Sequence, residues 1–370
     1  MARLELESLK SAIATYVASA KVDLSSLSVA KDNIVGLVDT IGKIFHLEHN
    51  VYDRLGELDA GSLSWGKTVE EWSQDMALPV TYDNDASGDK ALKDYSPTYR
   101  PVSFSVTLGR KIFPTSIPYG NVERAVHDEG EFMEVVTTIT KKLEDAVAIW
   151  KYGAKRQLLG EVMSRIDALA TNATAYVASS TALVNGSLYK TTGHVGVAMK
   201  DKSASADDWA TCVAQGDIVE LDNMAEEIPV PEDTTTAEAF ITAVKKAVEG
   251  AIDINEGNSF NGQVLGVTEG LILYIKQGVM PVVQVEALAG AFQKEELALP
   301  CEIKVIKDFG NYSGKGYALL MDRRAVKLFE GYNVTRDNMN GYGDRLNIFR
   351  HVEYTGHISR NAFFHEFCDD

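Results

Sequence analysis

Apolar residues recur at steps of three and four from residue 127 to residue 166, the longest stretch of this chain with a single periodicity. The spacing places them on one side of a helix and predicts one amphipathic helix. At about 1.5 Å per residue it would run roughly 55 to 60 Å, longer than most globular domains need. Gly153 and Gly160 each cost about 1 kcal/mol relative to alanine, which leaves room for a kink. The predicted core positions of this helix are Phe132, Val136, Ile139, Leu143, Val147 and Trp150.

A second pattern, with a period of two, precedes the helix. Apolar and polar residues alternate over residues 102–108, which predicts a strand with one dry face. Residues 69–80 are a plausible partner strand, and the polar stretch at 82–90 between them predicts a turn. An isolated two-stranded ribbon is only marginally stable in water, so we expect this arm to be ordered by a neighbouring subunit. The predicted contact residues are Val102, Phe104, Val106 and Leu108.

The N-terminal and middle parts of the chain mix helical and irregular patterns. Helical spacing within residues 1–50 predicts two short amphipathic helices. Residues 171–236 are rich in small and polar residues and predict loops with short strands. Helical spacing returns at 237–251 and at 285–299, while the apolar run at 264–275 fits a buried strand or a short helix.

The C-terminal seventy residues predict mainly strands. Alternation marks strands at 302–307 and 345–360, and the apolar run 317–321 predicts a buried strand. Residues 322–330 have the pattern of a short helical turn, and Asn340 with Gly341 predicts a turn before the last long strand. The predicted fold class is therefore α+β.

Composition bounds the class of protein. The chain has 370 residues, of which 45% are hydrophobic, and no apolar run approaches the roughly 18 residues that cross a bilayer. The balance of 36 basic and 53 acidic residues gives a net charge of −17, which argues against a protein that coats nucleic acid. Three cysteines without close spacing offer no disulfide framework and no paired-cysteine metal site. We expect synthesis in a cytoplasm.

No catalytic, cofactor-binding or metal-binding set is predicted. His46 and His49 could share one face of a helix, but no third ligand follows them, and surface histidines are more common. The glycine-containing run at 310–316 is similar to a phosphate loop, yet its spacing is short by one residue and Gly316 stands where Ser or Thr is required, so a hairpin turn fits better. A long chain with extended elements and no active site favours self-assembly.

The order of these elements resembles the major capsid proteins of tailed bacteriophages, built on the Hong Kong phage-type capsid fold. Two phrases support the resemblance, SIPYGNVERAV at 116–126 before the long helix and DRLNIFRHVEYTGHI at 344–358 near the end. The resemblance covers nearly the whole chain. It implies an N-terminal helical arm at 1–56, an extended β-hairpin loop at 57–120, a peripheral domain with the spine helix at 121–174, an axial domain at 175–300, and return strands at 301–370 that complete the peripheral domain.

The function implied by the resemblance is structural. Such proteins assemble as hexamers and pentamers into the icosahedral head that encloses double-stranded DNA, after synthesis in the cytoplasm of the host bacterium. The implied partners are further copies of the chain, a portal, a separate scaffolding protein or none, and packaged DNA through weak non-specific contact, with no membrane. An encapsulin-like shell protein, which has a related fold, is the first alternative. An α+β enzyme with an unrecognised site is the second, and a deep pocket with perturbed carboxylates would favour it.

Overall fold

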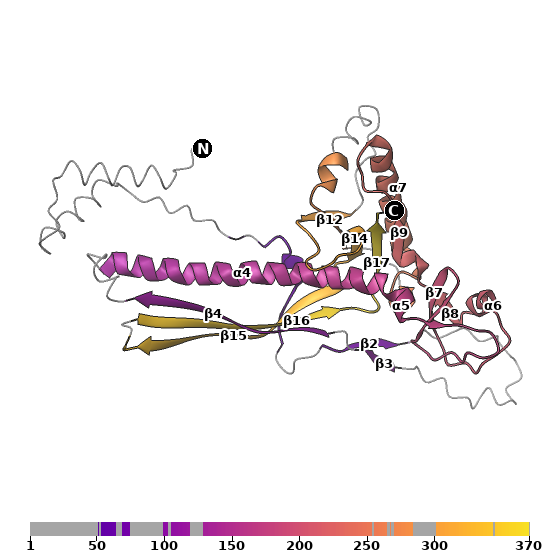
Figure 1. Ribbon diagram of the computed structural model, residues 1–370, viewed down its shortest axis with the longest axis horizontal. Coiled ribbons are helices and arrows are strands. Elements are labelled where there is room, and N and C mark those ends of the chain that lie inside the picture. Colours follow the sequence, from indigo (N-terminus) through magenta and orange to yellow (C-terminus); the bar gives the residue numbers. More distant parts are fainter. Residues whose placement is uncertain are drawn as a thin grey trace, which may run out of the picture. The chain divides into compact units, whose positions relative to one another are not determined.

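The structure is a computed structural model, and its helices and strands are labelled in Figure 1. The predicted helices within residues 1–50 and at 285–299, the polar turn at 82–90, the His46 and His49 pair, and Phe104 lie outside the part of the chain that it describes. The described residues are 51, 53–63, 69–74, 99–102, 105–118, 129–253, 255–264, 267, 270–283, 301–342 and 345–369.

The predicted long helix is confirmed. Helix α4 (Glu129–Asp167) has 39 residues and continues through both internal glycines. After a one-residue turn at Ala168 the chain forms the short helix α5 (Leu169–Asn172). None of the helices in the described part of the chain is both long and apolar enough to cross a membrane.

Helix α4 packs on a four-stranded sheet with the strand order β1-β15-β16-β4 (Figure 1). Strands β15 and β16 form an antiparallel hairpin, in which Asn340 pairs with Arg345. Strand β4 pairs antiparallel with β16 over nearly its whole length. The short helical turn predicted at 322–330 is wrong, because β15 starts at Val326 and alternation toward the core overrides the local helical spacing. The bounds are β1 (Asp59–Ser62), β4 (Ser105–Pro118), β15 (Val326–Asn340) and β16 (Arg345–Ile358).

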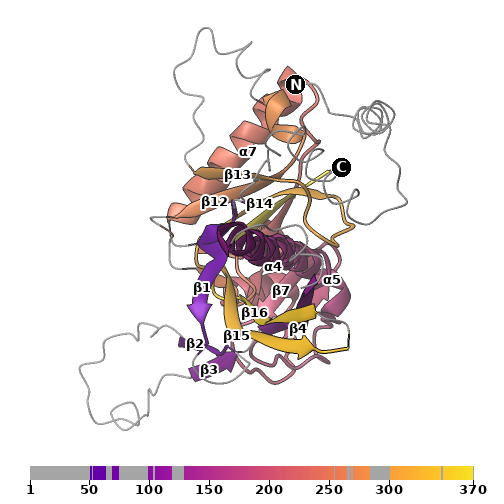
Figure 2. The ribbon, with the colours of Figure 1, turned by 90° about the vertical axis from the view of Figure 1, so that its left-hand side faces the viewer.

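A five-stranded sheet, in the order β13-β12-β14-β17-β9, separates two hydrophobic cores. Successive residues of β12 point to opposite sides, so that Tyr274 joins the core beneath α4 while Leu273 and Ile275 join the core beneath α7. Figure 2 shows α7 lying along this sheet. The bounds are β9 (Ala225–Glu227), β12 (Leu271–Lys276), β13 (Glu302–Ile306), β14 (Gly316–Asp322), β17 (Phe364–Cys368) and α7 (Thr234–Ile252).

Helix α7 confirms the predicted helix at 237–251. It begins in a capping box, in which the Asp233 side chain accepts a hydrogen bond from the Thr236 backbone and the Thr236 hydroxyl satisfies the Asp233 N–H. The buried strand β12 accounts for the C-terminal part of the apolar run at 264–275. The hairpin turn predicted for 310–316 is wrong, because β12 lies between β13 and β14, and the segment is a longer connection.

The remaining elements are short and form small sheets. Residues 171–236 contain loops with short strands, as predicted. The antiparallel pair β2-β3 joins residues 71–74 to residues 99–102, but residues 105–108 of the predicted arm strand are wrong as its continuation, because they belong to β4 and pair with β16. Their bounds are β2 (Glu71–Gln74), β3 (Tyr99–Val102), β5 (Thr174–Ala175), β6 (Leu188–Thr191), β7 (His194–Ala198), β8 (Ile218–Glu220), β10 (Asn255–Glu256), β11 (Gln263–Val264), α6 (Trp209–Ala214), and the 3-10 helices η1 (Gly56–Leu58) and η3 (Asp222–Met224).

The strands after residue 301 divide between both large sheets. Strands β15 and β16 pair with β4 and β1, whereas β13, β14 and β17 pair with β12 and β9 from the range predicted as axial domain. The predicted boundary at residue 300 therefore does not coincide with a boundary between sheets.

Candidate functional site

The face of α4 toward the sheet carries Leu143, Val147 and Trp150, three of the six predicted core positions. Leu143 and Val147 are buried. Trp150 is half-buried, and its ring lies against Phe113 of β4 and Tyr354 of β16, with centroid separations of 6.1 and 5.5 Å. These aromatic contacts join the helix to two strands that are far apart in sequence. The side chains of Phe132, Val136 and Ile139 lie outside the described part of the structure.

One lysine fixes the segment before β1 to α4. Lys155 is fully buried, and its Nζ donates to the backbone oxygen of Leu55 at 2.9 Å. The same ammonium forms ion pairs with Asp53 and with Asp59, the latter at 2.9 Å. A buried ammonium requires such partners, because an unpaired charge is costly to remove from water. The network places the end of the predicted arm range against the helix.

A carboxylate anchors strand β2 to the connection between β16 and β17. Glu71 accepts hydrogen bonds from the Ser359 hydroxyl at 2.7 Å, the Arg360 backbone N–H at 2.9 Å and the Asn361 side-chain amide at 2.9 Å. His357 lies 3.8 Å from Glu71, and burial lowers the pKa of this imidazole against the opposing effect of the Glu71 charge. Strand β2 of the predicted loop is therefore tied to the C-terminal strands of its own chain.

The predicted interface residues occupy different environments. Val106 and Leu108 are half-buried and pack against the main core of their own chain. Val102 ends β3, and its side chain lies outside the described part of the structure, as does the whole of Phe104. A neighbouring subunit can therefore contact only the part of the Val106 and Leu108 side chains that this core leaves exposed.

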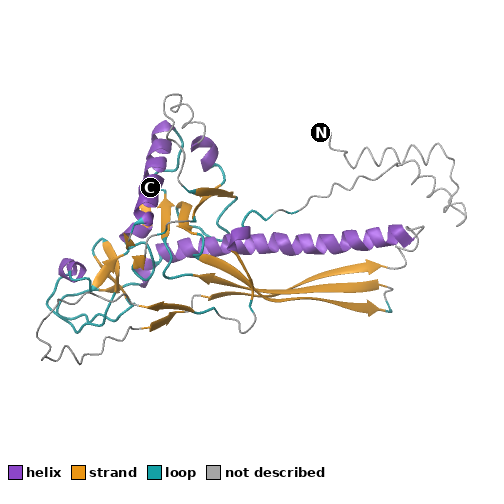
Figure 3. Cartoon of the chain, turned by 180° about the vertical axis from the view of Figure 1, so that it is seen from behind, coloured by secondary structure: helices purple, strands orange, loops and turns teal. Residues whose placement is uncertain are grey.

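The face of the β4-β16-β15 layer that points away from α4 is open. Ile112, His351 and Val334 are paired in register, so their side chains share one face, opposite to that of Phe113. Ile112 is 54% exposed and Val334 is 37% exposed. Figure 3 shows α4 over the other face and no described helix or strand over this one. We call this row of three residues the open sheet face.

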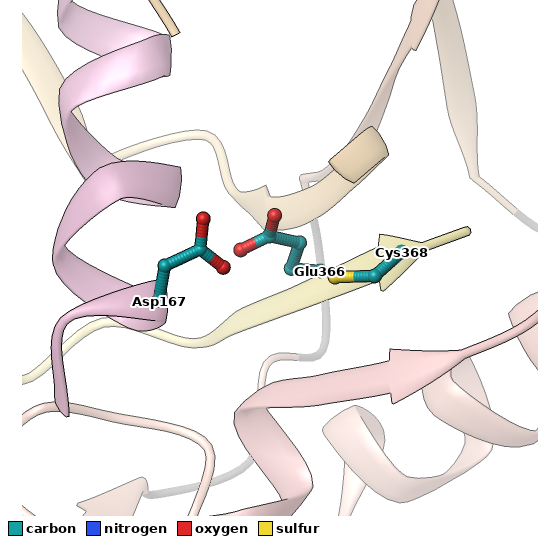
Figure 4. Close-up of side chains that lie close together, drawn as sticks. All are labelled: Asp167, Glu366 and Cys368. Atoms are coloured by element: carbon teal, nitrogen blue, oxygen red, sulfur yellow. The ribbon is translucent and has the colours of Figure 1, made fainter. Parts of the chain in front are cut away.

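A cluster of titratable side chains lies where the C-terminal end of α4 meets the last strand (Figure 4). Asp167 is the last residue of α4, and Glu366 and Cys368 lie two apart on one face of β17. The Tyr312 hydroxyl lies 2.8 Å from an oxygen of Asp167 and 2.8 Å from Oε1 of Glu366. Burial, with the nearby Asp167 charge, raises the pKa of Glu366 to about 8.

The sequence patterns gave no indication of several of these groups. Lys155 occurs in a helical stretch where lysines are expected to be solvated, and Glu71 stands in an imperfect strand pattern. Glu366 and Cys368 have the spacing of neighbours on one strand face, a weak local signal, but their partner Asp167 is distant in sequence. The glycine-containing run at 310–316 packs on α4, since a Cβ on Gly310 would lie 2.7 Å from Cα of Gln157. This close packing explains why residue 310 is a glycine, and no bound phosphate is needed to explain it.

Solved structures with a similar fold come from phage heads. The chain aligns with a chain of the Staphylococcus phage Andhra capsid with a TM-score of 0.57 and 10% identity, over 89% of this chain and 87% of that one. A chain in the structure of the head fiber and inner core protein gp22 of native bacteriophage P68 aligns with a TM-score of 0.58 and 10% identity, over 89% of this chain and 88% of that one. A chain of the cyanophage P-SCSP1u capsid aligns with a TM-score of 0.50 and 10% identity, over 90% of this chain and 94% of that one.

These likenesses establish the Hong Kong phage-type capsid fold that the sequence predicts. No curated protein sequence matches the chain. The family model of the Phi29-like phage major capsid protein matches residues 8–367, which include all but the ends of the chain. The chain thus belongs to the Phi29-like phage major capsid protein family, and it is a structural component of tailed-phage capsids.

Proposed function

We propose that this protein assembles as hexamers and pentamers of one chain into the icosahedral head of a tailed phage, and that the head encloses double-stranded DNA. The observation that carries the proposal is the family match over residues 8–367, joined to a capsid fold over 89% of the chain. The subunit is made in the cytoplasm of the host bacterium, and its other partners are the portal and a separate scaffolding protein. Its net charge of −17 limits DNA to weak, non-specific contact.

The contact between copies uses the arm and the open sheet face. Glu71 fixes strand β2 to its own subunit, while Ile112 and Val334 leave apolar surface exposed on the sheet beside it. Covering such surface contributes about 25 cal/mol for each Å² removed from water. In a closed shell of one protein, every subunit contacts further copies of the same chain, so a second copy is the partner that covers this surface.

Negative-stain electron microscopy and light scattering of the purified protein, with and without scaffolding protein, test the proposal directly. Shells or capsomer rings are the expected result. A chain that stays monomeric at high concentration and at several ionic strengths, in both preparations, would contradict self-assembly.

Two substitutions separate the arm from the open sheet face. Phe104→Asp and Ile112→Asp should each give a folded subunit that does not form shells, because each places a charge in a contact between copies. Ile112→Val is the matched control and should assemble normally. Shells of normal yield from Phe104→Asp would remove the arm from the contact, and the same result from Ile112→Asp would remove the open sheet face. A Phe104→Asp subunit that does not fold would assign Phe104 to the core of its own chain.

A further inference from the structure

The cluster at the end of α4 contains more carboxylate oxygens than its hydrogen-bond donors can satisfy. The Tyr312 hydroxyl has a single proton and lies near both Asp167 and Glu366, so it can donate to only one of them at a time. It also accepts a hydrogen bond from the Gly316 backbone N–H at 3.1 Å. Among the described residues, no lysine or arginine forms an ion pair with either carboxylate.

Glu366 is the buried member of the cluster. It is fully buried, and its second oxygen, Oε2, accepts no hydrogen bond from any N–H or O–H group of the described chain. The group beside it is the thiol of Cys368, which is a weak donor. A buried carboxylate oxygen without a strong donor requires a proton or a cation. Figure 4 shows the Asp167 carboxylate directed toward Glu366 from the end of the helix.

We propose that Asp167, Glu366 and Cys368 bind one Zn²⁺ ion. Their ligand atoms all lie within 4.8 Å of one another. Zn²⁺ bonds of about 2.0 to 2.3 Å in a tetrahedron hold ligand atoms roughly 3.5 Å apart, so side-chain movements of about 1 Å complete the site. The ion links the end of α4 to the last strand, two elements that are far apart in the chain.

The donor set selects the metal. A thiolate with two carboxylates suits Zn²⁺ better than Mg²⁺ or Ca²⁺, which prefer six or more oxygen ligands. Asp167 is exposed, so the ion has a path from solvent and a water molecule can complete its coordination. When Zn²⁺ binds, the Cys368 thiol loses its proton to solvent, and so does the Glu366 carboxyl group if it is protonated.

Tyr312 and two glycines support the site without ligating the ion. The Tyr312 hydroxyl donates a hydrogen bond to a carboxylate, and carboxylates that bind metals usually accept such a bond from a neighbouring side chain. At Gly314 and at Gly316 a Cβ would collide with oxygens of Asp167 and of Glu366, respectively. Both positions therefore leave room that the carboxylates occupy. The sequence patterns predict no metal site, because these ligands come together only in the folded chain.

Cobalt spectroscopy and zinc calorimetry on the full-length subunit test this proposal. The protein is treated with a chelator, the chelator is removed, and Co²⁺ is added. A thiolate–Co²⁺ charge-transfer band in the near ultraviolet is expected, and Zn²⁺ should abolish it by displacement. Cys368→Ser should remove the band and weaken Zn²⁺ binding more than about 100-fold, since loss of even an outer-shell partner costs 10- to 100-fold.

Control variants assign the signal. Cys301→Ser removes another half-buried cysteine and should leave the band intact. Asp222→Asn disables the surface group of His194, Glu220 and Asp222, which has no thiolate, and should also leave it intact. Asp167→Asn changes an exposed ligand, so this variant should fold even if Cys368→Ser does not. It should also weaken Co²⁺ and Zn²⁺ binding, which keeps the test decisive. Absence of the band in the wild-type protein, or its persistence in both ligand variants, would overturn the proposal. Because the readout uses the subunit, failure here is distinguishable from failure to assemble.

Discussion

Gly160 of α4 faces the backbone carbonyl of Phe309 so closely that a Cβ atom at this position would overlap the carbonyl oxygen. Gly153, seven residues earlier on the same helix, has no atom within 4 Å of the place where its Cβ would stand. The two glycines look alike in the sequence, and both weaken a helix. Only Gly160 is required, because the connection that follows β13 crosses the helix there.

Alanine substitutions at the two glycines should have opposite effects. Gly160→Ala should lower the free energy of unfolding by about 1 to 3 kcal/mol, the usual cost of overpacking a core. Gly153→Ala should raise it by about 0.5 to 1 kcal/mol, because alanine is the better helix former and meets no atom there. Urea denaturation of the unassembled subunit measures both. Equal effects from the two variants would show that the close approach at Phe309 is absent.

Removing the Trp150 ring should loosen α4 from its sheet. Complete burial would predict a loss of about 3 to 5 kcal/mol for Trp150→Ala, but the ring is half-buried, so we expect about 2 to 3 kcal/mol. Ile149→Ala is the neighbouring control, since Ile149 is 59% exposed and should change the free energy of unfolding by no more than about 0.5 kcal/mol. Thermal unfolding monitored by near-ultraviolet circular dichroism distinguishes the two. An unchanged Trp150→Ala melting curve would mean that the helix presents another face to the strands.

The ammonium of Lys155 should contribute more to the free energy of unfolding than the ammonium of Lys151 does. Lys155→Met leaves Asp53 without its ion-pair partner and removes a hydrogen bond to Leu55, so we expect a loss of about 3 kcal/mol. Lys151 also pairs with Asp59, at 2.9 Å, but it is partly exposed, so Lys151→Met should cost less than about 1 kcal/mol. Urea denaturation measures both free energies. Costs of similar size would show that solvent reaches Lys155.

Asp222 should hold the pKa of His194 above its ordinary value. A hydrogen bond to Asp222 at 2.7 Å raises the pKa of His194 above its ordinary value near 6.5. A raised folded-state pKa contributes stability that is fully present below about pH 6.5 and is lost as the pH rises through the folded pKa. Asp222→Asn should return the His194 pKa toward 6.5, as followed by NMR of the histidine ring protons. A wild-type pKa at or below 6.5 would refute the pairing.

The elements with strong periodicity were predictable from the sequence. The long helix, the helix that Asp233 caps and the buried strand β14 all have local signals, since spacing along the chain determines which side chains share a face. The segment at 322–330 shows the limit of this reasoning. Its spacing fits a helix, but pairing with β16 makes β15 a strand from Val326, and tertiary contacts override a short local preference.

The sequence by itself therefore determined the α+β class, the positions of helices α4 and α7 and, through the order of the elements, the capsid fold. The tertiary structure alone decided which distant groups meet: Gly160 with Phe309, Lys155 with Asp53, and Asp167 with Glu366. Periodicity describes neighbours within one helix or strand. The approach of residues that are more than a hundred positions apart depends on how sheets pair and pack, which a single sequence does not display.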